Sequence, residues 1–90
     1  MASIPEIVEQ IRSTASTFDN SRGTIEVEVN RMMNAVSGTT WTGQARQQFD
    51  TQWEEWRRRL ARMLNDLQAI ANGLRTEANQ LEEATRSFDR

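Results

Sequence analysis

The stretch that decides the fold is Ser37-Gly38-Thr39-Thr40-Trp41-Thr42-Gly43-Gln44, near the middle of the 90-residue chain. Two glycines and four hydroxyl residues crowd into its first seven positions, and no other part of the sequence looks like a loop. We expect Gly38 to take the left-handed conformation that ends a helix. Gly43 or a hydroxyl residue suits the cap of the next helix. Trp41 is unusual in a polar turn, which predicts that its ring anchors against neighbouring helices.

Upstream of this loop, a capping signal and a heptad pattern predict one helix over about residues 4–37. Ser3 and Glu6 form a capping box, and Pro5 suits the first helical turn. Nine of ten seam positions, spaced alternately by four and three residues, are apolar, whereas chance would supply roughly four at this composition. The seam is Ile4, Val8, Ile11, Ala15, Phe18, Arg22, Ile25, Val29, Met32 and Val36.

Gly23 follows the one polar residue of this seam, Arg22, and weakens the helix by about 1 kcal/mol relative to alanine. Two interpretations stay open. Gly23 is either a tolerated weak spot on the outer face or a place where a partner approaches closely, with Arg22 meeting a carboxylate across an interface.

Downstream of the loop, the same spacing predicts a second helix over about residues 44–88, with fraying expected near its end. Eleven of its twelve seam positions are apolar, and a second row at seven-residue intervals makes the apolar face wider than a two-stranded seam. The seam is Phe49, Trp53, Trp56, Leu60, Met63, Leu67, Ile70, Leu74, Glu77, Leu81, Ala84 and Phe88, and the second row is Leu64, Ala71 and Ala78.

The short loop, at about residues 38–43, forces the two helices into one antiparallel hairpin, a single all-α domain over residues 1–90. The longer second helix should overhang the start of the first, leaving a tail that contacts nothing within its own chain. A hairpin is one layer deep, so on the order of 1,000 Å² of apolar surface would stay wet, or about 25 kcal/mol of gross driving force. We therefore expect two hairpins, identical or paralogous, to dimerise into a four-helix bundle.

Composition excludes several classes of function. The chain has 11 basic residues, all arginine, and 13 acidic ones, so it lacks the basic face of a nucleic-acid binder. Its one basic cluster, Arg57-Arg58-Arg59 with Arg62, is expected to be neutralised by Glu54–Arg58 and Glu55–Arg59 pairs. There is no histidine, cysteine, lysine or tyrosine, so we expect no enzyme, no metal site and no cofactor.

No apolar run approaches the length of a membrane span, and the N-terminus lacks the basic and apolar regions of a secretory signal. Taken alone, these two observations predict a cytoplasmic protein. The polar helix faces are nearly neutral, so attraction to anionic lipid should be weak and strong membrane binding is not expected.

Two heptad helices joined by a Trp-x-Gly loop, in a chain of this length, resemble the WXG-motif family of type VII (ESX) secretion substrates, the early-secreted-antigen-like proteins. The matching residues are Trp41, Thr42 and Gly43, followed by Ala45 and Phe49. The resemblance implies export of the folded dimer, without a cleaved signal, through an ATPase of the FtsK/SpoIIIE type. It thereby reverses the cytoplasmic prediction and makes Trp41 and Gly43 half of an export signal.

In the family, the other half of that signal is the partner's C-terminal tail, which holds a tyrosine followed four residues later by an acid. By position these would be Leu81 and Thr85, so this chain departs from the pattern. Either it is the signal-less member of a heterodimer, or its tail is degenerate, with Leu81 as the apolar anchor. The acid would then be Glu82, Glu83 or Asp89. The candidate tail residues for contact with the ATPase are Leu81, Glu82, Glu83, Ala84, Thr85 and Phe88.

A rival hypothesis is a cytoplasmic coiled-coil adaptor or scaffold with no export role, motivated by the missing signal peptide and the missing tyrosine. Under that hypothesis Trp41 serves only to pack the end of the bundle. The sequence does not choose between homodimer and heterodimer.

Overall fold

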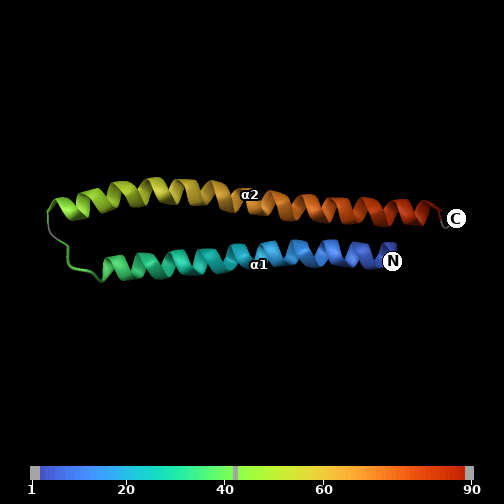
Figure 1. Cartoon of the computed structure of the whole chain (residues 1–90), viewed down its shortest axis with the longest axis horizontal. Helices are drawn as coiled ribbons and strands as arrows, with labels where there is room; N and C mark the ends of the chain where they lie inside the picture. Colours follow the sequence, from blue (N-terminus) through green and yellow to red (C-terminus); the bar gives the residue numbers. More distant parts are fainter. Residues whose placement is uncertain (1–2, 42, 89–90) are drawn as a thin grey trace.

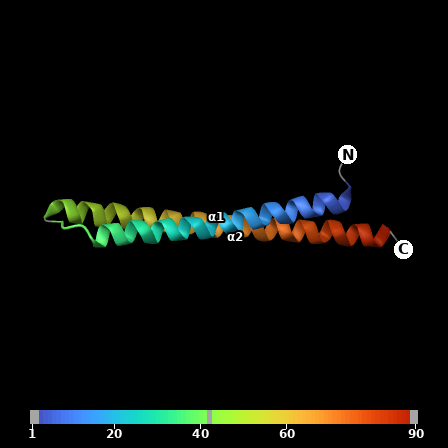
Figure 2. The ribbon, with the colours of Figure 1, turned by 90° about the horizontal axis from the view of Figure 1, so that it is seen from below.

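The hairpin predicted from the heptads is present. The computed structural model describes residues 3–41 and 43–88, and of residue 88 the backbone alone. Its elements are α1 (Ile4–Ser37) and α2 (Gln44–Phe88), two antiparallel helices that form a rod of 72 × 18 × 18 Å (Figure 1). Figure 2 shows that the two helices cross at a shallow angle near the middle of the rod. The described residues contain no strand, and the all-α prediction is confirmed.

Helix α1 begins as the capping signal predicts. The Ser3 hydroxyl accepts a hydrogen bond of 3.3 Å from the backbone N–H of Glu6, which satisfies one of the free donors of the first turn. Pro5 lies in that turn, where its missing N–H costs nothing.

The conformation predicted for Gly38 is wrong. Gly38 has φ −83° and ψ −5°, in the right-handed region, and its N–H donates to the Asn34 carbonyl at 3.0 Å. The Thr39 hydroxyl donates to the Ala35 carbonyl at 2.8 Å, so the last turn of α1 is satisfied without a left-handed residue. The left-handed residue is instead Gly43, with φ 67°, immediately before α2. The glycine of the Trp-x-Gly motif is therefore the one that the backbone requires.

The shared core of the two helices is thin. Among the described residues only Val8, Ala15, Ala71 and Ala78 are buried, and no large side chain is fully covered. All four belong to the first half of α1 or the second half of α2, and these two segments form the half of the rod that holds the chain termini (Figure 1). Because alanine is small, the helix axes can approach closely in this half.

The other half of the rod is wider. Figure 1 shows that α1 and α2 lie farther apart toward the loop than toward the termini. Here the side chains between the helices are large: Met33, Phe49 and Trp53 are all half-buried. Large side chains hold the axes apart, so the hairpin is a wedge, narrow at its termini and broad at its loop.

The prediction that the tail contacts nothing in its own chain is wrong. Leu81, Glu82 and Thr85 are half-buried, and the Glu82 carboxylate contacts Arg12 of α1 at 2.9 Å. Figure 1 shows the reason, because α2 extends past α1 at both ends of the rod. The loop lets α2 start beyond the end of α1, so only part of the extra length is left at the termini.

The backbone conformations at Gly43 and Gly23 predict that substitution by alanine changes the free energy of unfolding in opposite directions. Gly43→Ala places a side chain at positive φ and should lower the free energy of unfolding by about 1–2 kcal/mol. Gly23→Ala fills open space on a helix and should raise it by about 0.5–1 kcal/mol. Urea denaturation of both variants at one protein concentration measures the difference. A Gly43→Ala variant as stable as the wild type would contradict the assignment of strain to this position.

Candidate functional site

A continuous row of aromatic rings occupies the loop end of the hairpin. Trp41 stacks on Phe49 with ring centroids 5.2 Å apart, Phe49 on Trp53 at 5.8 Å, and Trp53 on Trp56 at 5.0 Å. The Trp53 indole N–H points to the Met33 sulfur at 2.8 Å. The loop tryptophan is thus anchored by packing onto α2. Its own indole N–H is buried and has no hydrogen-bond partner among the described residues.

The contact with Trp53 comes from Met33, not from the predicted seam residue Met32, which is 39% exposed. Adjacent methionines give the heptad pattern two equally apolar choices at this position. The sequence therefore places a methionine in the seam without saying which one.

At the terminal end, the tail of α2 is fastened to α1 by polar contacts. Arg12 donates to the Glu82 carboxylate at 2.9 Å and to the Asn79 side-chain oxygen at 3.0 Å. Glu82 also accepts from Arg86 at 3.0 Å, so its carboxylate is occupied on two sides. The Glu83 side chain, by contrast, is 74% exposed.

The other predicted tail residues differ in accessibility. Leu81 is half-buried, Ala84 is exposed, and the hydroxyl of half-buried Thr85 donates to the Leu81 carbonyl within its own helix at 2.9 Å. A recess of about 220 Å³ lies beside them, lined by Ile4, Pro5, Val8, Glu9, Glu82, Thr85 and Arg86. The side chain of Phe88, together with Asp89 and with Thr42 of the loop, lies outside the described residues.

The cross-helix polar contacts were not predicted from the sequence. Besides Arg12–Glu82, Arg75 contacts Asp19 at 2.5 Å and Arg22 donates to the Gln68 side chain at 3.2 Å. A signal for the two ion pairs is present in the spacing. Arg12 and Asp19 lie seven residues apart in one helix, Arg75 and Glu82 in the other, and the antiparallel order brings opposite charges together.

These polar contacts occupy one flank of the hairpin. At about 100° per residue, Arg12 and Asp19 are rotated by roughly 40–60° from the buried Ala15, and Arg75 by about 40° in the same sense from Ala71. Two antiparallel helices are related by an approximate twofold axis perpendicular to the plane that contains both helix axes. Side chains rotated from the contact by the same angle and in the same sense in the two helices therefore lie on the same face of the hairpin. We call this the polar face.

Side chains that are rotated in the opposite sense from Ala15 and Ala71 form an apolar face. Trp56, Met63 and Ile70, spaced by seven residues along α2, are 40%, 61% and 47% exposed. Phe18, Ile25 and Met32 of α1 share this face, because their rotation from Ala15 has the opposite sign to that of Arg12. Other predicted seam residues are half-buried where they lie nearer the sister helix: Ile11, Val29, Phe49, Trp53, Leu60, Leu67 and Leu74. The predicted seam is thus divided between the helix–helix contact and an open apolar surface.

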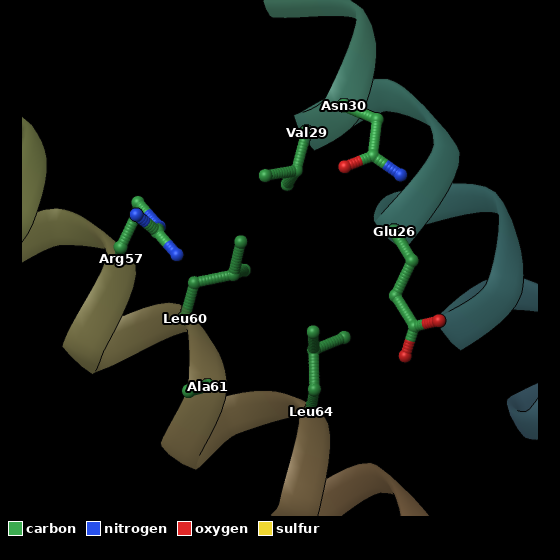
Figure 3. Close-up of a pocket in the computed structure, with 7 residues that line it drawn as sticks. All are labelled: Glu26, Val29, Asn30, Arg57, Leu60, Ala61 and Leu64. Carbon is green, nitrogen blue, oxygen red and sulfur yellow. The ribbon is translucent and has the colours of Figure 1, made fainter. Parts of the chain in front are cut away.

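A groove lies between the helices (Figure 3). At about 100° per residue, Glu26, Asn30 and Arg57 are rotated from Ala15 and Ala71 toward the polar face, so the groove opens on that side. It has a volume of about 330 Å³ and is lined by Glu26, Val29, Asn30, Arg57, Leu60, Ala61 and Leu64. Figure 3 shows Glu26 and Arg57 on opposite walls, and Arg57 contacts Glu54 at 3.3 Å. The groove lies in the half of the rod where the two helices are farther apart.

The arginine cluster beside this groove is neutralised in a slightly different way from the one predicted. The Glu55–Arg59 contact is present at 2.6 Å. Glu54, however, contacts Arg57, three residues on, and not Arg58. Both spacings place side chains on one helix face, so the preference between them is small.

The loop motif and the tail are separated by the length of the molecule. The loop between α1 and α2, which contains Trp41 and Gly43, is at one end of the 72 Å rod, and the C-terminal part of α2, which contains Leu81 to Thr85, is near the other (Figure 1). Within one chain these two groups of predicted site residues are not brought together. Any surface that combines a loop with a tail needs a second chain.

Two further properties concern the described residues alone. Neither helix has a stretch long and apolar enough to cross a membrane. No cluster of three or more acidic, histidine or cysteine residues is placed to hold a metal ion within residues 3–41 and 43–88.

Comparison with known families gives one match. The family model WXG100, described as "Proteins of 100 residues with WXG", matches residues 8–85, which include both helices and the Trp41–Gly43 motif. Comparison with curated proteins and with solved structures gave no match.

The match agrees with the observed hairpin, since the family consists of helical hairpins that are secreted, non-enzymatic substrates of type VII secretion and typically dimerise with themselves or with paralogues. The resemblance drawn from the Trp-x-Gly loop between heptad helices is confirmed. The chain belongs to the WXG100 family of type VII secretion substrates.

Proposed function

We propose that this chain leaves the cell as a folded dimer, with itself or with a paralogue, recognised by an export ATPase of the FtsK/SpoIIIE type. The loop around Trp41 and Gly43 of one subunit and the tail of the other together form the recognised surface. Localisation is then extracellular, without a cleaved signal peptide.

The observation that carries this proposal is the distance between loop and tail. The two elements lie at opposite ends of a 72 Å rod, so a single hairpin presents them separately. An antiparallel second hairpin lays its tail beside the first hairpin's loop. The exposed row of Trp56, Met63 and Ile70 supports the same requirement, because these side chains stay wet until a second chain covers them.

Within the tail, Glu83 is the best acid for recognition among the described candidates. Its side chain is 74% exposed, whereas the Glu82 carboxylate is held by Arg12 and Arg86. A carboxylate already occupied on two sides has little capacity left for a further partner. We assign Glu82 the role of fastening the tail and Glu83 the role of contact, with Leu81 as the apolar anchor.

Export should depend on the ATPase. In cells that secrete type VII substrates, the protein should be found in the culture supernatant at its intact mass, and deletion of the ATPase should remove it. Retention inside wild-type cells, with other substrates still secreted, would instead favour a cytoplasmic adaptor.

The two tail acids should behave differently on neutralisation. Glu83→Gln should lower the amount exported without changing thermal stability, because its side chain makes only a 3.7 Å contact to Arg86. Glu82→Gln should lower stability slightly, by no more than about 1 kcal/mol, because it weakens the ion pair with Arg12. Quantifying exported protein against melting temperature separates the roles. Normal export of Glu83→Gln would contradict the assignment.

A further inference from the structure

We propose that the apolar face is covered by a second copy of this same chain, laid antiparallel and centred near Asp66, so that Glu77 of each copy meets Arg59 of the other. This inference deepens the proposed function and rests on its premise that hairpins pair. It names the partner, the face and the charge contact that fixes the register.

The amount of surface requires a partner of this size. The hairpin exposes 7097 Å², whereas a compact monomer of 10.4 kDa would expose about 5,400 Å². The excess is about 1,700 Å² for each chain, roughly twice the 800 Å² or so that each partner buries in a standard interface, and two chains together reach the range of obligate homodimers. A second rod of equal length is the simplest object that covers the excess along the whole chain.

The apolar row of α2 is self-complementary. Trp56, Met63, Ile70 and Glu77 recur every seven residues, and the midpoint of this row falls between Met63 and Ile70. The midpoint of α2, a 45-residue helix over Gln44–Phe88, falls at Asp66, in the same place. An antiparallel copy can therefore overlap α2 along its full length and still place Met63 against the partner's Ile70.

The apolar row of α1 has its centre at the same level of the rod. Phe18, Ile25 and Met32 are spaced by seven residues around Ile25. Ile25 lies level with Asp66, because its neighbour Arg22 contacts Gln68 and Glu26 lines one groove with Leu64. One twofold axis therefore serves both helices, placing Ile25 against the partner's Ile25 and Phe18 against the partner's Met32.

The same axis explains the one charge in the apolar row. Glu77 is exposed and falls opposite the partner's Trp56. Arg59 lies less than one turn beyond Trp56 on the same rim of α2, and its side chain is 66% exposed. Arg59 contacts Glu55 at 2.6 Å, but a guanidinium has five donors and can bridge two carboxylates. Within one chain Arg59 and Glu77 are separated by about 27 Å along the helix, so they can meet only between copies.

One contact works against this arrangement. The two Asp66 side chains approach each other near the axis. Asp66 is exposed, so solvent and salt screen the repulsion. Two Glu77–Arg59 contacts and the apolar rows outweigh this single like-charge approach.

Charge reversal tests the register by sedimentation over a range of concentrations. Wild-type protein should sediment at twice its monomer mass of 10.4 kDa. Glu77→Arg and Arg59→Glu should each raise the dissociation constant at least about tenfold, because two attractive contacts per dimer become repulsive. An equimolar mixture of the two variants should recover the wild-type constant, because both contacts between unlike variants are again attractive. Recovery also shows that both variants fold.

Two controls make the test specific. Arg58→Glu makes the same charge change in the same cluster but away from the apolar face, and Glu55→Gln removes only the contact within the helix. Neither should move the dissociation constant by more than about twofold.

Absence of recovery in the mixture, or an effect of Arg58→Glu as large as that of Arg59→Glu, would overturn the register. A wild-type chain that stays at 10.4 kDa at high concentration would overturn self-pairing. If ATPase-dependent export persisted in that case, the proposed function would stand with a paralogue as the partner.

Discussion

Two helices that touch each other share only one line of contact. In this molecule the size of the side chains along that line governs how closely the helices approach and how much apolar surface they bury. Where the line is made of Ala15, Ala71 and Ala78, the helices come close and the three side chains are fully buried. Where it is made of Met33, Phe49 and Trp53, the helices lie farther apart and these side chains are only half-buried. A hairpin built in this way buries little apolar surface, and most of its apolar side chains lie at the edges of the contact between the helices.

The two flanks of that contact have different chemistry. On the polar face, exposed or half-exposed ion pairs such as Arg12–Glu82 contribute little free energy each, at most about 1 kcal/mol. Their effect is to fix how far one helix slides past the other, because a slip of one turn separates both cross-helix pairs. On the apolar face the row of Trp56, Met63 and Ile70 in α2 consists of apolar side chains, and Arg59 and Asp66 lie at its rim. The hairpin thus has one face suited to water and one suited to another protein.

The sequence predicted the helices well because the heptad spacing is nearly unbroken, and the Ser3–Glu6 cap is a local signal. It did not predict which apolar row faces the sister helix, since the rows containing Trp56 and Ala71 are both apolar. That choice depends on side-chain size across the contact, which involves residues far apart in the chain.

Two local predictions failed for physical reasons of the same kind. Gly38 was expected to be left-handed, but hydrogen bonds from Gly38 and Thr39 already close α1, and the unusual backbone angle falls at Gly43. The tail was expected to contact nothing in its own chain. Instead, α2 extends past α1 at both ends of the rod, so part of its extra length lies at the loop end and less of it at the termini. Both outcomes depend on the path of the loop, which spacing patterns do not encode.

Placing the loop and the tail at opposite ends has a consequence for how a symmetric pair would travel. Under twofold symmetry each tip of the pair carries one loop and one tail, so the two tips are identical. The orientation of such a dimer would not matter for transport, because either tip presents the same loop and tail to a channel. Entering lengthwise, it also offers only its narrow cross-section, 18 Å for each hairpin, and has no need to unfold in order to become thin.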